Sequence, residues 1–84
     1  MFTNKTPEGR NNIVGIKMAQ IRKEMDISQR ILSDRLTESG LLVDKNAIQR
    51  MESGQRFITD IELVYISKVL NVSIYELLGI QENT

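Results

Sequence analysis

The side chains best suited to recognition chemistry lie in the segment 44–54, DKNAIQRMESG. If this segment is a helix that turns Ala47, Ile48 and Met51 inward, its opposite side is polar. Amide side chains can bond adenine through two hydrogen bonds, and arginine or lysine can bond N7 and O6 of guanine. The spacing therefore predicts a surface that reads base edges in a DNA major groove, and its residues are Lys45, Asn46, Gln49 and Arg50. The alternative is an ordinary solvated helix face.

Residue types that carry catalysis are scarce. The chain has no cysteine and no histidine, which excludes disulfides, the usual zinc ligands and a general base built on imidazole. The carboxylates are dispersed along the chain, and there is no glycine-rich cradle for phosphate. We therefore expect no enzymatic activity, no metal and no cofactor.

Three helices are predicted in the first two-thirds of the chain. Apolar residues recur at helical spacing over about residues 12–25. The inward face of the second helix is Leu36 together with Ile31 or Leu32, and the third is the segment described above. The residues expected to begin helices are Ser28 and Asp44, and those expected to end them are Gly40, Gly54 and Asn71.

Two further helices are indicated by capping boxes. Thr59 with Glu62, and Ser73 with Glu76, each place a hydroxyl and a carboxylate three residues apart, where they can satisfy exposed amides reciprocally. The last helix is then 74–78. No strand alternation or internal repeat competes with these helices.

These elements predict an all-α fold, a compact five-helix bundle. We expect one domain over residues 12–80, preceded by a flexible lead-in at 1–11 and followed by a frayed end at 81–84. Lys5 and Arg10 would make the lead-in a disordered, weakly basic arm, because Glu8 lies between them.

Charge is unevenly distributed although the net charge is zero. Residues 1–56 hold ten basic and seven acidic side chains, whereas residues 57–84 hold one and four. This asymmetry would turn the first part of the chain toward phosphates, or it is simply an uneven solvated surface. No apolar stretch approaches the roughly 20 residues that span a bilayer, and the N-terminus lacks the apolar core of a signal peptide. We therefore expect a cytoplasmic protein that does not contact a membrane.

At this point the sequence resembles a known family, the lambda repressor/Cro type of helix-turn-helix, also called the xenobiotic-response-element family. The resemblance covers about residues 12–79. It is carried by Val14, Met18, Ile21-Arg22, Ile27-Ser-Gln29, Leu32-Ser33, Leu36, Ile48, Met51-Glu-Ser-Gly54, Leu70-Asn-Val-Ser73 and Glu76-Leu-Leu78. The family implies a five-helix DNA-binding domain that is usually dimeric on a near-palindromic operator.

The chain departs from the family pattern at three places. Residues 37–43 make the connection between the second and third helices about five residues longer than usual, which resembles a long-turn subgroup. Ser33 replaces a usual alanine, and Ile31 replaces the glutamate that would complete a capping box with Ser28.

The resemblance also assigns roles to individual residues. Base contacts fall on Lys45, Asn46 and Arg50, and less regularly on Gln49. Arg22 and Glu52 match two places that the family commonly joins in a buried ion pair. Phosphate contacts are expected at the start of the second helix and after the third, where helix amides and polar side chains can share a phosphate. These residues are Gln29, Ser53, Gln55 and Arg56.

The last helix and its tail carry more apolar surface than one short helix can bury. Dimer contacts would therefore fall on Ile74, Tyr75, Leu78 and Ile80, unless these residues simply complete the core. The same two possibilities hold for Leu41, Leu42 and Val43 in the extended turn. We expect a sequence-specific DNA-binding transcriptional regulator of the phage or bacterial repressor type that binds double-stranded DNA as a homodimer. The alternative is a non-enzymatic interaction module, antitoxin-like or anti-repressor-like, on the same scaffold.

Overall fold

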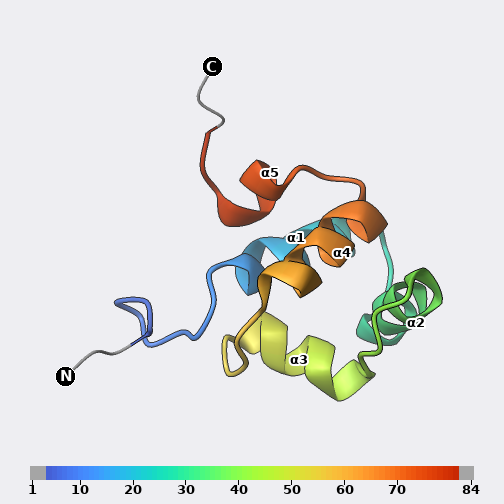
Figure 1. Ribbon diagram of the computed structural model, residues 1–84, viewed down its shortest axis with the longest axis horizontal. Coiled ribbons are helices and arrows are strands. Elements are labelled where there is room, and N and C mark those ends of the chain that lie inside the picture. Colours follow the sequence, from blue (N-terminus) through green and yellow to red (C-terminus); the bar gives the residue numbers. More distant parts are fainter. Residues whose placement is uncertain (1–3, 82–84) are drawn as a thin grey trace.

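The computed structural model describes residues 4–81. Within that range the chain forms five α-helices and no strand, so the predicted all-α fold is confirmed. The bounds are α1 Val14–Glu24, α2 Gln29–Ser39, α3 Lys45–Ser53, α4 Asp60–Leu70 and α5 Ile74–Leu78. In Figure 1, α4 crosses in front of α1, α5 lies at the top and α3 runs along the lower edge.

The core draws side chains from every helix. α1 packs against α3 and α5, and α2 packs against α3 and α4. As a result α1 and α2 pack against the inner side of α3, and its outer side is exposed. The residues less than 2% exposed are Met18, Leu32, Leu36, Ile48, Met51, Ile66 and Leu77.

Local capping sets where the helices begin. The Ser28 hydroxyl accepts from the amide of Ile31 over 3.0 Å, and the Asp44 carboxylate accepts from the amide of Ala47 over 2.7 Å. Thr59 and Glu62 form the complete capping box.

The second predicted capping box is wrong in one half. The Ser73 hydroxyl accepts from the amide of Glu76 over 3.0 Å, but no return bond from the Glu76 carboxylate to the Ser73 amide is present in the described part of the chain. A single bonded amide is enough here because α5 is only five residues long and is anchored by the buried Leu77.

The helix ends follow the predicted stop residues. Gly40, Gly54 and Asn71 have φ angles of 116°, 83° and 57°, the left-handed conformation that ends an α-helix. α1 is shorter at both ends than the predicted 12–25. At its start the Asn12 side chain lies before the helix and accepts from the amide of Gly15 over 2.8 Å, and beyond its end Asp26 adopts a left-handed conformation, with φ 58°.

The extended turn after α2 divides its apolar residues. Val43 is buried and Leu41 packs against the core, whereas Leu42 is 85% exposed. The Thr37 hydroxyl donates to the carbonyl of Val43 over 3.3 Å, which ties the turn to α2. On α2 itself Leu32 is the inward residue and Ile31 lies on the surface.

No helix among the described residues is long and apolar enough to cross a membrane. The expected fraying concerns residues 81–84, of which 82–84 lie outside the described range. The expected flexibility of the lead-in stays a prediction, but residues 6–12 are folded onto the domain and make hydrogen bonds that the sequence did not predict.

Candidate nucleic-acid interface

α3 has two chemically different sides. Its inner residues Ala47, Ile48 and Met51 are buried, as the spacing predicted. The candidate base-contacting residues all lie exposed on the outer side, and they are Lys45, Asn46, Gln49 and Arg50. The spacing therefore correctly predicted which side of α3 is polar and exposed.

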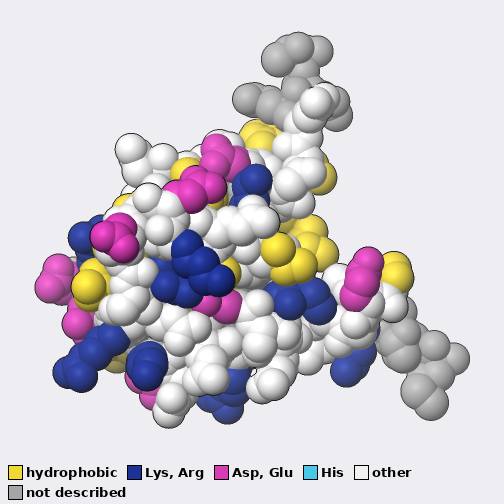
Figure 2. All heavy atoms as spheres, turned by 180° about the vertical axis from the view of Figure 1, so that it is seen from behind, with side chains coloured by type: hydrophobic (Ala, Val, Ile, Leu, Met, Phe, Trp, Pro, Cys, Tyr) yellow, Lys and Arg dark blue, Asp and Glu magenta, His cyan; other side chains and the backbone are white. Residues whose placement is uncertain are grey.

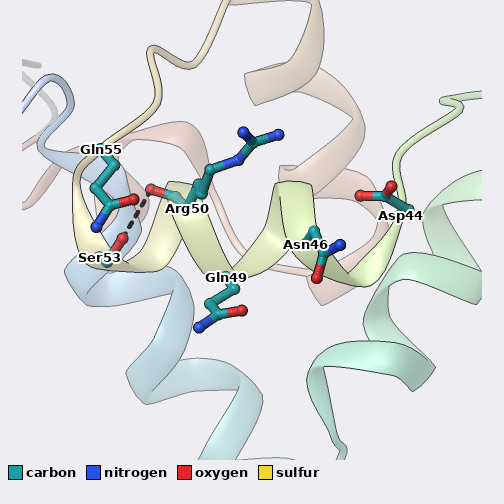
Figure 3. Close-up of a pocket in the computed structure, with 6 residues that line it drawn as sticks. All are labelled: Asp44, Asn46, Gln49, Arg50, Ser53 and Gln55. Atoms are coloured by element: carbon teal, nitrogen blue, oxygen red, sulfur yellow. Dashed lines mark hydrogen bonds between the residues drawn. The ribbon is translucent and has the colours of Figure 1, made fainter.

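Most of this face lines an open hollow of about 410 Å³. Figure 3 shows Asn46 and Gln49 pointing to one side of α3, while Arg50 extends the opposite way. Within residues 4–81, no hydrogen bond or ion pair engages the side chains of Asn46, Gln49 or Arg50. Their donors and acceptors are available to an external partner.

Arg22 and Glu52, the pair expected from the family resemblance, lie in direct contact. Arg22 Nε is 2.7 Å from Glu52 Oε2 and Nη2 is 3.0 Å from Oε1, and both side chains are about nine-tenths buried. Arg22 Nη1 also donates to the carbonyl of Ile27 over 2.9 Å. One guanidinium thus joins α1, the turn before α2 and the end of α3.

Gln29, a candidate phosphate contact, belongs to the same network. Its Nε2 donates to Glu52 Oε1 over 2.9 Å. One of its two amide N–H groups is therefore used inside the protein, and only the second is free for a phosphate.

Arg56, the positively charged candidate for a phosphate contact, is paired with Glu62. Arg56 Nη1 and Nη2 donate to the two oxygens of Glu62 over 3.0 and 2.8 Å, and Nη1 also donates to the carbonyl of Phe57 over 3.1 Å. The hydrogen bond to Glu62 raises the pKa of Arg56 above its ordinary value despite partial burial.

Glu62 responds in the opposite direction. Burial by itself raises the pKa of Glu62, but hydrogen bonds from Arg56 and from the amide of Thr59, together with the Arg56 charge, bring its pKa below the ordinary value of 4.5. The pair leaves little net charge at this end of the interface. This ion pair was not predicted from the sequence, where Glu62 was assigned only to the capping box.

The remaining phosphate candidates lie at the end of α3. Ser53 and Gln55 are exposed and line the same hollow as Asn46. The Ser53 hydroxyl donates to the carbonyl of Arg50 over 3.2 Å, as the dashed line in Figure 3 marks, and the Gln55 side chain points toward Ser53 in this view.

The candidate dimer residues on α5 are only partly covered. Ile74 and Leu78 are half-buried, while Tyr75 is 42% and Ile80 is 54% exposed. Leu77 belongs to the core and Leu78 packs against it, whereas Tyr75 and Ile80 lie at the surface. Figure 2 shows hydrophobic side chains gathered beneath the C-terminal segment, whereas Lys and Arg side chains recur along the lower edge, the edge where α3 lies.

Five helices with a two-sided α3 held by α1 and α2 define a helix-turn-helix domain. A protein-family model described as helix-turn-helix matches residues 18–77 of the chain. The chain belongs to this lambda repressor-like helix-turn-helix family, whose members bind DNA. No curated protein and no solved structure matches the chain.

Proposed function

We propose that this protein is a sequence-specific transcriptional regulator of the repressor type that inserts α3 into the major groove of double-stranded DNA. The observation that carries the proposal is the exposed face of α3, whose amide and guanidinium groups have no partner within residues 4–81. An α-helix with its side chains is about 10–12 Å across, which suits a major groove about 12 Å wide.

The proposed base contacts follow from hydrogen-bond geometry. Asn46 and Gln49 would bond adenine, and Lys45 and Arg50 would bond guanine. Because none of these side chains must leave an internal partner, each contact would form at little cost to the free protein.

The proposed phosphate contacts use N–H donors that are not engaged in hydrogen bonds within the protein. A guanidinium has five N–H donors, and three hydrogen bonds engage Arg56. The second N–H of the Gln29 side chain and the free amides at the start of α2 would bind a phosphate on the other flank of α3, with Ser53 and Gln55 beside Arg56.

A homodimer on a near-palindromic operator is part of the proposal. The support is the half-covered apolar surface of α5, since an isologous two-fold contact would bury Tyr75 and Ile80 of both copies. Selecting bound sites from a random pool of duplexes tests binding, sequence preference and half-site symmetry together.

Alanine variants then test the assignment of roles. Asn46→Ala and Arg50→Ala should each lose ~1–3 kcal/mol on the selected operator and relax the preference at one position. Arg56→Ala should weaken operator and scrambled DNA alike and lower the salt slope by about one unit or less. Lys68→Ala removes an exposed cation on α4 and serves as the control.

The second candidate function is an interaction module that binds another protein. It is supported by exposed apolar side chains on α4 as well as α5, since Ile61 is 64% exposed. If Asn46→Ala and Arg50→Ala bound every duplex as the parent does, α3 would not be the helix that contacts the bases. The interaction module would then be the favoured function.

A further inference from the structure

The lead-in before α1 forms a closed turn. The amide of Gly9 donates to the carbonyl of Thr6 over 2.9 Å, and the amide of Thr6 donates to the carbonyl of Arg10 over 2.8 Å. The amide of Arg10 also donates to the Thr6 hydroxyl over 3.0 Å. These bonds hold the following residues, 10–12, against the rest of the domain.

Residues 10–12 bind the end of α3 through hydrogen bonds. Arg10 Nη2 donates to the carbonyl of Glu52 over 2.9 Å, and Asn12 Nδ2 donates to the carbonyl of Met51 over 2.9 Å. The last carbonyls of a helix have no partner within the helix, so they must find donors elsewhere. Here the lead-in supplies those donors across about 40 residues of sequence.

The lead-in also binds the loop after α3, which contains candidate phosphate contacts. The amide of Asn11 donates to the carbonyl of Gly54 over 2.8 Å, and Asn11 Nδ2 donates to the carbonyl of Gln55 over 2.9 Å. Asn12 Nδ2 also donates to the carbonyl of Arg56 over 2.7 Å. Consecutive carbonyls of the loop are therefore all bonded to the lead-in.

Glycines make room for this contact. A Cβ at Gly54 would lie 2.8 Å from Arg10 Cζ, and a Cβ at Gly15 would collide with the carbonyl oxygen of Met51 and lie 2.8 Å from Arg10 Nη2. The close approach of α1, the lead-in and the end of α3 thus depends on missing side chains at two places.

We propose that residues 6–12 are a clasp that positions the end of α3 and the loop 54–56 for DNA binding, with Arg10 and Asn12 as positioning residues. The proposal rests on the proposed function. This clasp differs from a basic arm that reaches along DNA, because the Arg10 guanidinium donates its hydrogen bonds to carbonyls of the protein itself. Lys5, by contrast, is exposed and makes no ion pair within residues 4–81.

Arg10→Met and Lys5→Met form a matched pair, since each removes one positive charge from the lead-in. Amide hydrogen exchange of the free proteins comes first. The amides of Gln55 and Arg56 donate to the carbonyl of Arg50 and report on the loop. In Arg10→Met they should exchange about tenfold faster or more, while the core amide of Ile48 is unchanged, and Lys5→Met should match the parent. Unchanged exchange in Arg10→Met would overturn the clasp.

DNA binding is then measured on the selected operator at a temperature where all variants are folded. Arg10→Met should lose about tenfold in affinity at an unchanged salt slope, because a positioning residue releases no counterions. Arg10→Lys, which keeps the positive charge and N–H donors but not the planar guanidinium, should recover part of the loss. A salt slope lower by about one unit would mean direct contact with phosphate, and an unchanged affinity would mean no positioning; either result would overturn the proposal.

Asn11→Ala provides a milder variant if Arg10→Met folds poorly. It removes only the bond from Nδ2 to the Gln55 carbonyl, together with an Oδ1 atom that is buried without a partner. It should speed exchange at Gln55 by a smaller factor than Arg10→Met does. A parent protein that binds no duplex would overturn the proposed function, and the exchange comparison would then decide the clasp by itself.

Discussion

The side-chain amide of Gln29 donates to the same Glu52 carboxylate that Arg22 binds, over 2.9 Å. Gln29 is the first residue of α2 and Glu52 is the last but one of α3. A single buried carboxylate therefore links the beginning of one helix of the helix-turn-helix to the end of the other. We expect this link to help hold the angle between α2 and α3, and with it the presentation of the α3 face.

Arg22→Met should be strongly destabilising. It leaves the Glu52 charge buried without its cation, which costs ~3–5 kcal/mol at a well-buried site. Urea denaturation at neutral pH measures the loss. The double variant Arg22→Met/Glu52→Met should recover much of it, because no unpaired charge remains. A double variant less stable than Arg22→Met alone would contradict this account.

Gly15→Ala should destabilise the domain although alanine favours helices over glycine. The added Cβ would collide with the carbonyl oxygen of Met51, and overpacking of this kind costs ~1–3 kcal/mol. Gln20→Ala, at an exposed position of the same helix, is the matched control and should be nearly neutral. Thermal unfolding of the two variants decides it; a Gly15→Ala protein as stable as the parent would show that α1 and α3 can separate freely.

Stability should fall in acid through the Arg56–Glu62 pair. The pKa of Glu62 is lower in the folded protein than its ordinary value of 4.5. Its contribution is therefore fully present above about pH 4.5 and is lost as the pH falls through the lower folded pKa. Arg56 stays protonated throughout, since its pKa is raised.

The variant Glu62→Gln should flatten this part of the stability profile, measured by urea denaturation between pH 3 and 6. Arg56→Met should make the acid loss shallower or reverse its sign, because burial then acts on Glu62 without the opposing cation. Parallel profiles for Glu62→Gln and the parent would refute the assignment.

Tyr75→Asp should shift the sedimentation profile from dimer to monomer without loss of helical content. A charge at a half-exposed position of α5 is harmless in the monomer but would be desolvated in a two-fold contact. Ile31→Asp, at a position of α2 that is 42% exposed like Tyr75, is the control and should leave assembly unchanged. A parent that sediments as a monomer at high concentration and binds a single half-site would exclude the α5 dimer.

Local signals explain why much of the fold could be predicted from the sequence. Ser28, Asp44 and Thr59 bond amides three residues away, and Gly54 supplies a conformation that few other residues adopt. Such signals need no knowledge of the rest of the chain. The polar face of α3 was predictable for the same reason, because one helical period places Asn46 opposite Ile48.

The contacts of polar side chains between distant segments were not predictable. Arg10 and Arg56 looked like free cations, yet one binds the carbonyl of Glu52 and the other binds Glu62. A long polar side chain can reach many partners, and sequence spacing does not choose among them. The Arg22–Glu52 contact was predicted with the help of the family resemblance, which named both places.

The position of the lead-in bears on how the protein is handled in the laboratory. A shortened protein that begins at residue 13 would lack the donors that Arg10, Asn11 and Asn12 give to the end of α3 and to the loop after it. A tag attached after residue 81 would leave from the α5 side, at the opposite edge of the molecule in Figure 1. Immobilisation through the C-terminal side with the lead-in kept therefore leaves α3 open to duplex, whereas removal of the lead-in would leave carbonyls at the end of α3 without these donors.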